Sequence, residues 1–404
     1  MLKKFFIDNF KSLVDFEVEL SHFNCLIGLN GAGKSTLLQA IDFASSLMTG
    51  DVESWLSKRG WESKDLNSAL VNRRNITLGF EVQIDNDEYR WDAVFNRDID
   101  KLRCTQEKVS KLSDKAVLFS LENGMYRTAD SASTFPVDFT YKGSVFSRLK
   151  LERLSPELVK VKERIASLRS MDLLSPQLLR KKAKKADEGD IGMGGEHLSA
   201  FIHELSNKQQ HQLLTQLQNF YPHVCSLEAK PLRAGWIQLE ITEQHGKDNT
   251  KYVPIVKKSG HIFREPLMMV TEARHINDGM LRLLAILAQQ FSPLETLLFD
   301  EIENGINPEI TEQVVDALVA SPKQTIVTTH SPMVLNYLED EIARQSVTLL
   351  YKRPDGRTQA CRFFEIPSAS QKLSCLAAGD AMLDLSLKDM AIEAEQIRSA
   401  SHVH

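Results

Sequence analysis

Cysteines are few in this sequence, and long apolar runs are absent. No two cysteines have C-x-x-C spacing, and no stretch of 18 residues is uninterruptedly apolar. The first feature argues against a structural zinc site and for a reducing compartment; the second argues against a membrane span. Lys3 and Lys4 begin the chain like a signal peptide, but Asp8 and Lys11 break any apolar core. We therefore expect a cytoplasmic protein that does not act at a membrane. The cysteines are Cys25, Cys104, Cys225, Cys361 and Cys375.

Strong charge of one sign and sustained heptads are missing as well. The formal net charge is −5, so no global field draws the protein onto nucleic acid, and any such surface must be a local patch. Without heptads over several repeats, long coiled-coil arms are excluded. With 404 residues, 42% of them hydrophobic and 25% charged, the chain has the composition of a globular protein of two or three domain-sized units.

A glycine-rich segment near the N-terminus carries the strongest motif. Residues 28–35 match G-x-x-x-x-G-K-[ST] and lie between a buried-strand pattern, Cys25–Ile27, and an apolar helical pattern. Such glycines let backbone N–H groups point at phosphate oxygens, and the following helix offers its positive end to the same anion. Lys34 should reach the β- and γ-phosphates, and Ser35 should ligate Mg²⁺. The predicted nucleotide-binding residues are Asn30, Gly31, Ala32, Gly33, Lys34, Ser35 and Thr36.

Two later strand patterns end in polar residues suited to nucleotide hydrolysis. The first ends in Asp300, predicted to hold Mg²⁺, and Glu301, predicted to polarise the attacking water. The second, at 324–328, leads to His330, whose imidazole could hydrogen-bond the γ-phosphate. Each pattern alone is common at strand ends. Because both follow a phosphate loop in this order along the chain, together they indicate nucleotide hydrolysis.

The chain divides into three segments by composition. Residues 1–145 combine the phosphate loop with antiparallel-looking strands, and residues 146–229 read as an inserted helical lobe with helical runs at 146–186 and 198–220. Residues 230–404 return to strands and then to alternating helices and strands, which indicates parallel βα units.

The ordered motifs resemble those of ABC-type ATPase heads of the RecF, SMC and OLD group. More narrowly, the chain is similar to the arm-less AAA-family ATPases of bacterial anti-phage defence systems. The resemblance implies an α/β fold, namely a P-loop ABC-type head with a mixed sheet, an antiparallel subdomain and an inserted helical lobe. It also implies ATP and Mg²⁺ as cofactors. The segments that carry it are Phe10–Leu13, Gly28–Thr36, Gly195–Phe201, Asp300–Glu301, Glu303–Pro308 and Thr329–Pro332.

The same resemblance implies a signature loop that closes over the γ-phosphate bound by a second subunit. The matching residues are Asn277, Asp278 and Gly279, directly before an apolar-periodic helix. Asn277 stands where the group usually has Ser, and Asn307 stands where it commonly has His. Gln83 is a candidate for the glutamine that links Mg²⁺ to the helical lobe, although a solvated strand residue is an equal reading.

One basic cluster suits a nucleic-acid contact. It is equally compatible with a solvated helix end, and no aromatic residue interleaves with it in the sequence. The cluster comprises Arg180, Lys181, Lys182, Lys184 and Lys185.

The resemblance thus predicts a homodimer or higher oligomer that encloses ATP and controls a separately encoded effector, a nuclease or toxin, in anti-phage defence. The alternatives are a RecF-like DNA-binding repair ATPase and a nucleotide-gated scaffold with negligible turnover. We expect no nuclease activity from this chain alone, because too few residues follow the last strand pattern, Cys361–Ile366, for another domain of about 100 residues. Asp380, Asp384 and Asp389 lie there on a leucine-bearing helical pattern that reads as surface.

Overall fold

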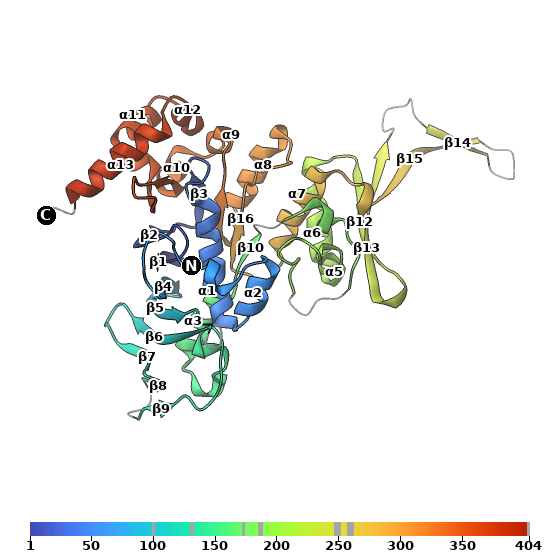
Figure 1. The fold of residues 1–404 in the computed structure, drawn as a ribbon. Coiled ribbons are helices and arrows are strands. Elements are labelled where there is room, and N and C mark those ends of the chain that lie inside the picture. The colour runs from blue at the N-terminus through green and yellow to red at the C-terminus, as the bar shows by residue number, and fades with distance from the viewer. Residues whose placement is uncertain are drawn as a thin grey trace. The chain divides into compact units, whose positions relative to one another are not determined.

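A computed structural model describes residues 1–98, 102–129, 133–171, 174–184, 189–245, 252–256 and 262–401 (Figure 1). The chain forms two compact units. The first comprises Met1–Ser170, Leu294–Ile302 and Val315–His404, and the second comprises Met171–Pro293 and Glu303–Val314. The division into segments 1–145, 146–229 and 230–404 stays a prediction.

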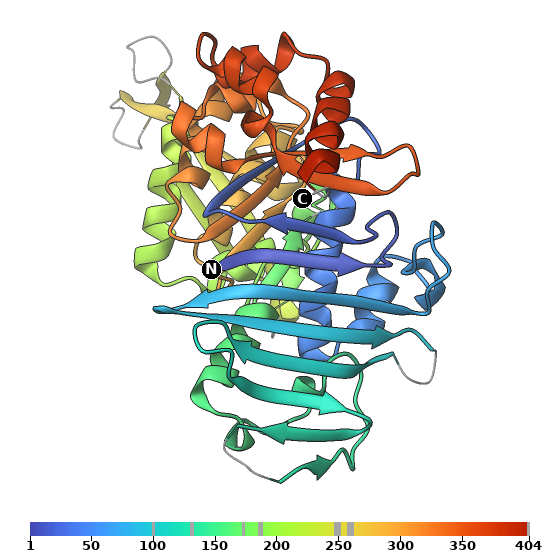
Figure 2. The same cartoon turned by 90° about the vertical axis from the view of Figure 1, so that its left-hand side faces the viewer.

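An eight-stranded antiparallel sheet forms one layer of the first unit, and Figure 2 shows its strands side by side. Buried and half-exposed residues alternate along β5, as expected for a strand with one face on a core. In spatial order the strands are β2 (Phe16–Glu19), β1 (Leu2–Asp8), β4 (Asn75–Ile84), β5 (Asp87–Asn96), β6 (Arg103–Lys111), β7 (Val117–Glu122), β8 (Met125–Thr128) and β9 (Phe135–Pro136).

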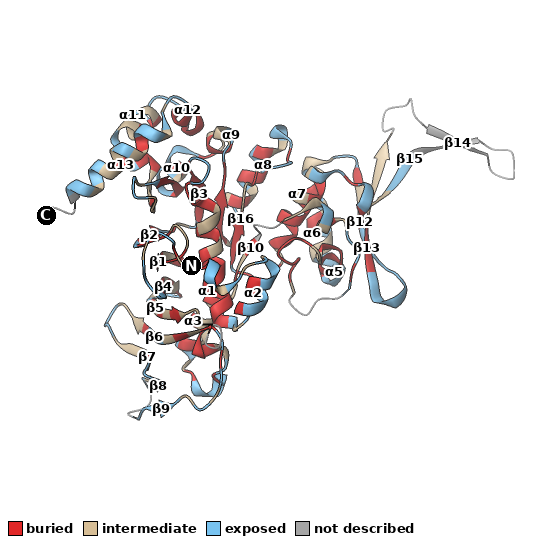
Figure 3. Cartoon of the chain, viewed as in Figure 1, coloured by how far each residue is buried: buried red, intermediate tan, exposed pale blue. Residues whose placement is uncertain are grey.

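A six-stranded sheet forms the second layer of this unit. Its central strands pair in parallel, and every residue of β3, β16 and β17 is buried, as expected for strands covered on both faces (Figure 3). The strand order is β10 (Leu168–Met171), β16 (Thr296–Phe299), β17 (Gln324–Thr328), β3 (Phe23–Ile27), β18 (Val347–Lys352) and β19 (Thr358–Arg362).

Helix α1 (Lys34–Thr49) contributes to the main core of this unit together with residues of both sheets. It is buried on almost all sides, and its polar residues Asp42, Ser45 and Ser46 are buried together with the apolar ones. The buried Asp42 on this helix accepts hydrogen bonds from Trp55 Nε1 at 2.6 Å, Arg59 at 3.0 Å and the Ser170 N–H at 3.0 Å. A buried carboxylate with this many donors ties α1 to α2 and β10 without an unpaired charge.

The remaining helices of the first unit are short. They are α2 (Val52–Lys58), α3 (Pro156–Ala166), α9 (Pro332–Asn336), α10 (Asp340–Ser346), α11 (Pro367–Leu373), α12 (Ala378–Leu383) and α13 (Leu387–Ser401), with 3₁₀ turns η1 (Ser63–Asp65), η2 (Val145–Ser147), η3 (Leu151–Arg153) and η6 (Phe363–Glu365). Across the described ranges, no helix is both long and apolar enough to cross a membrane.

The second unit combines helices with a small antiparallel sheet in the order β11, β13, β15, β14, and β12 also pairs with β13. Helix α8 (Pro308–Val319) begins here and ends in the first unit. The other elements are α4 (Pro176–Leu179), β11 (Ala183–Lys184), α5 (Leu198–Glu204), α6 (Asn207–Phe220), β12 (Val224–Pro231), η4 (Arg233–Gly235), β13 (Trp236–His245), β14 (Tyr252–Val256), β15 (Ile262–Glu272), η5 (Ala273–His275) and α7 (Asp278–Gln289).

The helical run predicted for 146–186 is less regular than its composition indicates. It contains α3 and α4 but also the strands β10 and β11, which each join a sheet. Sheet pairing with residues far away in the sequence decides these segments, and a local pattern does not encode it.

Candidate functional site

Three adjacent parallel strands bring the predicted hydrolysis residues to one edge of the six-stranded sheet. β17 lies between β16 and β3, with Phe299 opposite Val327 and Thr328 opposite Leu26. Because the carboxyl ends of parallel strands meet at the same edge, the phosphate loop after β3, the acids after β16 and the histidine after β17 share that edge.

The phosphate loop has the backbone shape that its glycines permit. Gly28 and Gly33 have φ values of 147° and 112°. A Cβ on Gly28 would lie 2.2 Å from the Leu350 carbonyl oxygen, and one on Gly33 would lie 2.6 Å from Thr358 Oγ1. Thr358 also donates a hydrogen bond to the Ala32 carbonyl at 2.9 Å. The loop is therefore packed against β18 and β19, which leaves no room for larger residues at these two positions.

Lys34 opens α1 and folds back over the loop. Its Nζ donates to the Gly28 carbonyl at 2.9 Å and to the Leu29 carbonyl at 3.3 Å, and the side chain is buried. Ser35 and Thr36 follow in the first helical turn and are half-buried. A buried ammonium group next to helix N-terminal amides is an anion-binding arrangement.

Thr328 connects the two acids to the neighbouring strand. Its hydroxyl donates to Asp300 Oδ1 and accepts a hydrogen bond from the Glu301 N–H at 2.8 Å. Glu301 has a φ of 48°, an uncommon conformation for a residue with a side chain. Its carboxylate lies 3.7 Å from His330 Nε2, and both side chains are partly exposed, at 46% and 37%. A carboxylate and an imidazole of this kind can orient a water molecule between them.

The donor set at this edge fits Mg²⁺. The ion takes one or two protein ligands and completes its shell with water and phosphate oxygens, so a cluster of several acids is not required. Ser35 and Asp300 supply a hydroxyl and a carboxylate from two segments at the same edge of the sheet. Neither side chain is enclosed, since both are of intermediate exposure.

The signature-loop residues lie in the second unit. Asn277 is the N-cap of α7, and its Oδ1 accepts a hydrogen bond from the Met280 N–H at 2.8 Å. Asn therefore performs the capping role that Ser would have here. A Cβ on Gly279 would lie 2.6 Å from the Gly305 carbonyl oxygen, so this glycine lets the turn after the acids approach α7 closely. Asn307 accepts a hydrogen bond from the Glu309 N–H at 3.2 Å at the start of α8.

The basic cluster does not act as one surface. Arg180 donates to Asp278 and to the Ile276 carbonyl, so its guanidinium braces the signature loop. Lys181, Lys182 and Lys184 are exposed, whereas Lys185 lies outside the described residues. Lys184 Nζ stands 5.2 Å from the centre of the Trp236 ring, because β11 pairs with the start of β13. The fold thus supplies the aromatic neighbour that the linear sequence lacks.

Gln83 and a nearby cavity do not extend this site. Gln83 lies in β4, where its backbone N–H and carbonyl both pair with Met1.

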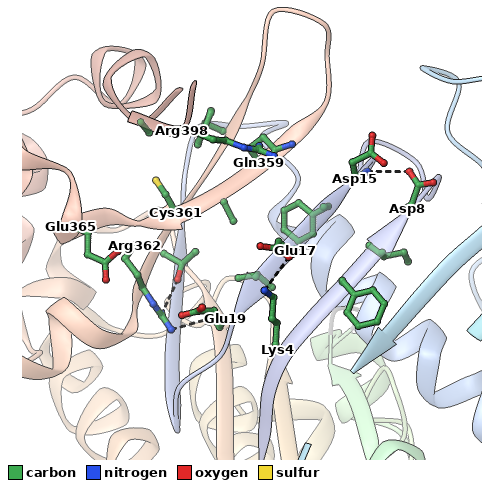
Figure 4. Close-up of a pocket in the computed structure, with 18 of the residues that line it drawn as sticks. Lys4, Asp8, Asp15, Glu17, Glu19, Gln359, Cys361, Arg362, Glu365 and Arg398 are labelled. Atoms are coloured by element: carbon green, nitrogen blue, oxygen red, sulfur yellow. Dashed lines mark hydrogen bonds and ion pairs between the residues drawn. The ribbon is translucent and has the colours of Figure 1, made fainter. Parts of the chain in front are cut away.

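A cavity of about 750 Å³ opens between β1, β2, β19 and α13 (Figure 4). Two of its basic groups have partners within the chain: Lys4 lies 3.0 Å from Glu17, and Arg362 donates to the Glu19 backbone carbonyl at 3.1 Å. None of the predicted nucleotide-site residues lines it.

Two residues important to the site were missed at the level of sequence. Thr328 was assigned only to a strand, and Thr358 had no assigned role. A threonine at the end of a buried strand, two residues before the predicted histidine, was the available signal for Thr328. Nothing local marks Thr358, because it meets the phosphate loop through the pairing of β18 with β3 and β19.

Two segments match known ATPase domain families. Residues 1–79, which include the phosphate loop, match an AAA ATPase domain. Residues 270–336, which include the signature loop, the acids and His330, match the family described as an AAA domain, putative AbiEii toxin, Type IV TA system. The two matches cover the two stretches in which the predicted motifs stand.

Individual relatives agree with this result. A segment of 83 residues is 36% identical to an OLD nuclease of Thermus scotoductus, and the match spans 20% of this chain and 15% of that protein's length. An SMC head solved with the C-terminal winged-helix domain of ScpA superimposes with a TM-score of 0.52 at 15% identity, covering 89% of this chain and 97% of that chain. The predicted fold class is therefore confirmed: the chain has the α/β fold of an ABC-type ATPase head of the SMC kind.

Proposed function

We propose that this ABC-type ATPase head binds ATP with Mg²⁺, hydrolyses it, and uses it to join two copies of the chain. The observation that carries the proposal is the shared sheet edge, where the phosphate loop, Asp300, Glu301 and His330 follow three neighbouring parallel strands. This edge combines a group that holds phosphate with a carboxylate and an imidazole within 3.7 Å of each other.

Each residue has one task in the proposed reaction. Lys34 leaves the loop carbonyls and pairs with the β- and γ-phosphate oxygens. Ser35 and Asp300 hold Mg²⁺, which when bound neutralises charge on the phosphates. Glu301 accepts a proton from the attacking water, and His330 donates a hydrogen bond to the γ-phosphate. The Thr328 hydroxyl keeps Glu301 in its left-handed backbone conformation.

The site is completed by a second copy in this proposal. The loop of Asn277, Asp278 and Gly279 opens α7 and offers free N-terminal amides to an anion. Bound ATP then selects the closed dimer, and hydrolysis releases it. The output is control of a separately encoded effector, a nuclease or toxin, in anti-phage defence, and the likeness of one segment to an OLD nuclease is consistent with a nuclease as that effector.

The Glu301→Gln variant tests the assignment of the base. Gln keeps the size of the side chain but cannot accept the proton, so turnover should fall by about 10²–10⁴-fold. ATP binding and ATP-dependent dimerisation should persist, because Lys34 and the signature loop are unchanged. Lys34→Ala serves as the matched control and should lose both. Unimpaired hydrolysis by Glu301→Gln would refute the role of Glu301.

A second candidate function, nucleic-acid binding, is favoured by one observation. Trp236 is 43% exposed, and Lys184 Nζ lies 5.2 Å from the centre of its ring. Cationic side chains near an exposed aromatic ring are the elements of a single-strand contact. Under this reading the chain is a RecF-like DNA-binding ATPase, and ATPase rates measured with and without DNA distinguish it from the first proposal. A nucleotide-gated scaffold would show negligible turnover in both.

A further inference from the structure

A short apolar run on β15 is exposed on both faces of the strand. Leu267, Met268, Met269 and Val270 are 42%, 51%, 46% and 58% exposed, although successive residues of a strand point to opposite sides (Figure 3). The exposed apolar side chains are therefore divided between the two faces of the strand. The cross-strand residues on β13, Thr242 to His245, are polar by contrast.

One edge of this run has no partner strand among the described residues. Leu267 to Val270 pair with β13 on one side, and β14 pairs only with residues 262–266. An open edge flanked by apolar, uncharged side chains is a template for another strand, which would pair with its backbone groups and bury those side chains.

The run is complementary to itself. In an antiparallel two-fold pairing centred on Met269, Met269 of one copy faces Met269 of the other, and Met268 faces Val270. No like charges meet within these four residues, and cross-strand apolar pairs stabilise a sheet. A two-fold contact uses the same edge on both copies and closes after two, so it produces a dimer rather than a fibre.

We propose that the Leu267–Val270 edge of β15 pairs with the same edge of a second copy of this chain, without nucleotide. This contact is separate from the ATP-dependent pairing of the previous subsection. The strand runs directly into the signature loop, since β15 ends at Glu272, η5 follows, and Asn277 caps α7. A dimer held at β15 raises the local concentration of the second signature loop before ATP binds. The paired area lies in the range of weak, transient interfaces, so the association is concentration-dependent.

Sedimentation velocity of the nucleotide-free Lys34→Ala variant tests this contact without any contribution from ATP. We expect a monomer–dimer equilibrium between about 1 and 100 µM, as for weak interfaces of this size. Met268→Lys and Val270→Lys should each raise the dissociation constant at least tenfold, because each dimer would then set two lysine side chains against apolar partners. Leu383→Lys is the matched control: this apolar residue on α12 is 69% exposed, and its replacement should leave the equilibrium unchanged.

Cysteine cross-linking tests the register. The exposed Cys375 is first replaced by Ser. Equal amounts of Met268→Cys and Val270→Cys chains should then form more disulfide-linked dimer when mixed than either forms alone. Three results would overturn the proposal. The first is a monomer at about 100 µM, and the second is self-association that Met268→Lys leaves unchanged. The third is equal cross-linking of the mixed and the separate chains. ATPase activity does not enter any of these readouts, so the outcome is independent of the proposed enzymatic function.

Discussion

Replacement of Thr328 by valine tests how the acid pair is positioned. The side chain is fully buried, and valine has nearly its shape, so the change removes the hydroxyl without leaving a cavity. Two hydrogen bonds disappear, one to Asp300 and one from the Glu301 N–H at 2.8 Å. The bond to the charged Asp300 contributes about 1.5–3 kcal/mol. The left-handed backbone of Glu301, at a φ of 48°, costs roughly 1–2 kcal/mol and loses its support.

The expected consequence is a loss of turnover larger than the loss of binding. If about 1.4–2.7 kcal/mol of this positioning is used in the transition state, kcat falls roughly 10–100-fold. The KM for ATP should change much less, because the phosphate loop lies on a different strand. Steady-state ATPase rates and titration with a fluorescent ATP analogue measure the two effects. Thr328→Ser keeps the hydroxyl and should retain most of the turnover. A folded Thr328→Val variant with wild-type kcat would refute the reasoning.

Two further predictions concern other parts of the chain. Burial raises the pKa of Glu107 to about 7, although Ser144, the Val145 N–H and Trp91 donate hydrogen bonds to it. The unfolded chain therefore ionises this group from about pH 4.5 while the folded chain keeps it protonated to about 7. The free energy of unfolding therefore falls across that window by up to about 3 kcal/mol. Glu107→Gln should raise the Tm measured by circular dichroism at pH 8, relative to the parent protein, and should not raise it at pH 4. Equal Tm differences at both pH values would exclude this explanation. Trp236→Ala should weaken the binding of a labelled single-stranded oligonucleotide about 5–100-fold, because base stacking on the ring is lost. Leu232→Ala is the control. Unchanged affinity of Trp236→Ala would exclude the second candidate function.

The sequence predicted the parts of the site that are local. The phosphate loop and the acids at 300 and 301 are recognisable because strand, turn and polar residues are contiguous there. The role of Thr328 is not local, because its hydroxyl meets residues 27 and 28 positions away through the register of β16 and β17. For the same reason Trp236 could not be placed beside Lys184, which precedes it by 52 residues and meets it only through β11 and β13.

The fold was predictable to a similar extent. Parallel βα units after residue 270 follow from apolar runs that alternate with helical periodicity, and the six-stranded sheet agrees. The strands β10 and β11 were missed because their sequences, within a Leu- and Lys-rich segment, carry no strand pattern. Asn277, which stands where the group usually has serine, caps α7, and serine can also cap a helix.

The central claim is that each ATP lies between the phosphate loop of one copy and the signature loop of the other. Lys34→Ala removes the first half of a site. Asn277→Asp disables the second, because aspartate keeps the helix cap but sets a negative charge against the γ-phosphate. Asn277→Ser keeps both the cap and the neutral charge and should retain activity.

Mixing these two inactive variants is the most direct measurement. In a one-to-one mixture half of the dimers are mixed, and each mixed dimer has one intact site, so independent sites predict about a quarter of the wild-type ATPase rate. A site completed in trans predicts this recovery. A mixture no more active than the separate variants, or an Asn277→Asp variant with wild-type turnover, would contradict it.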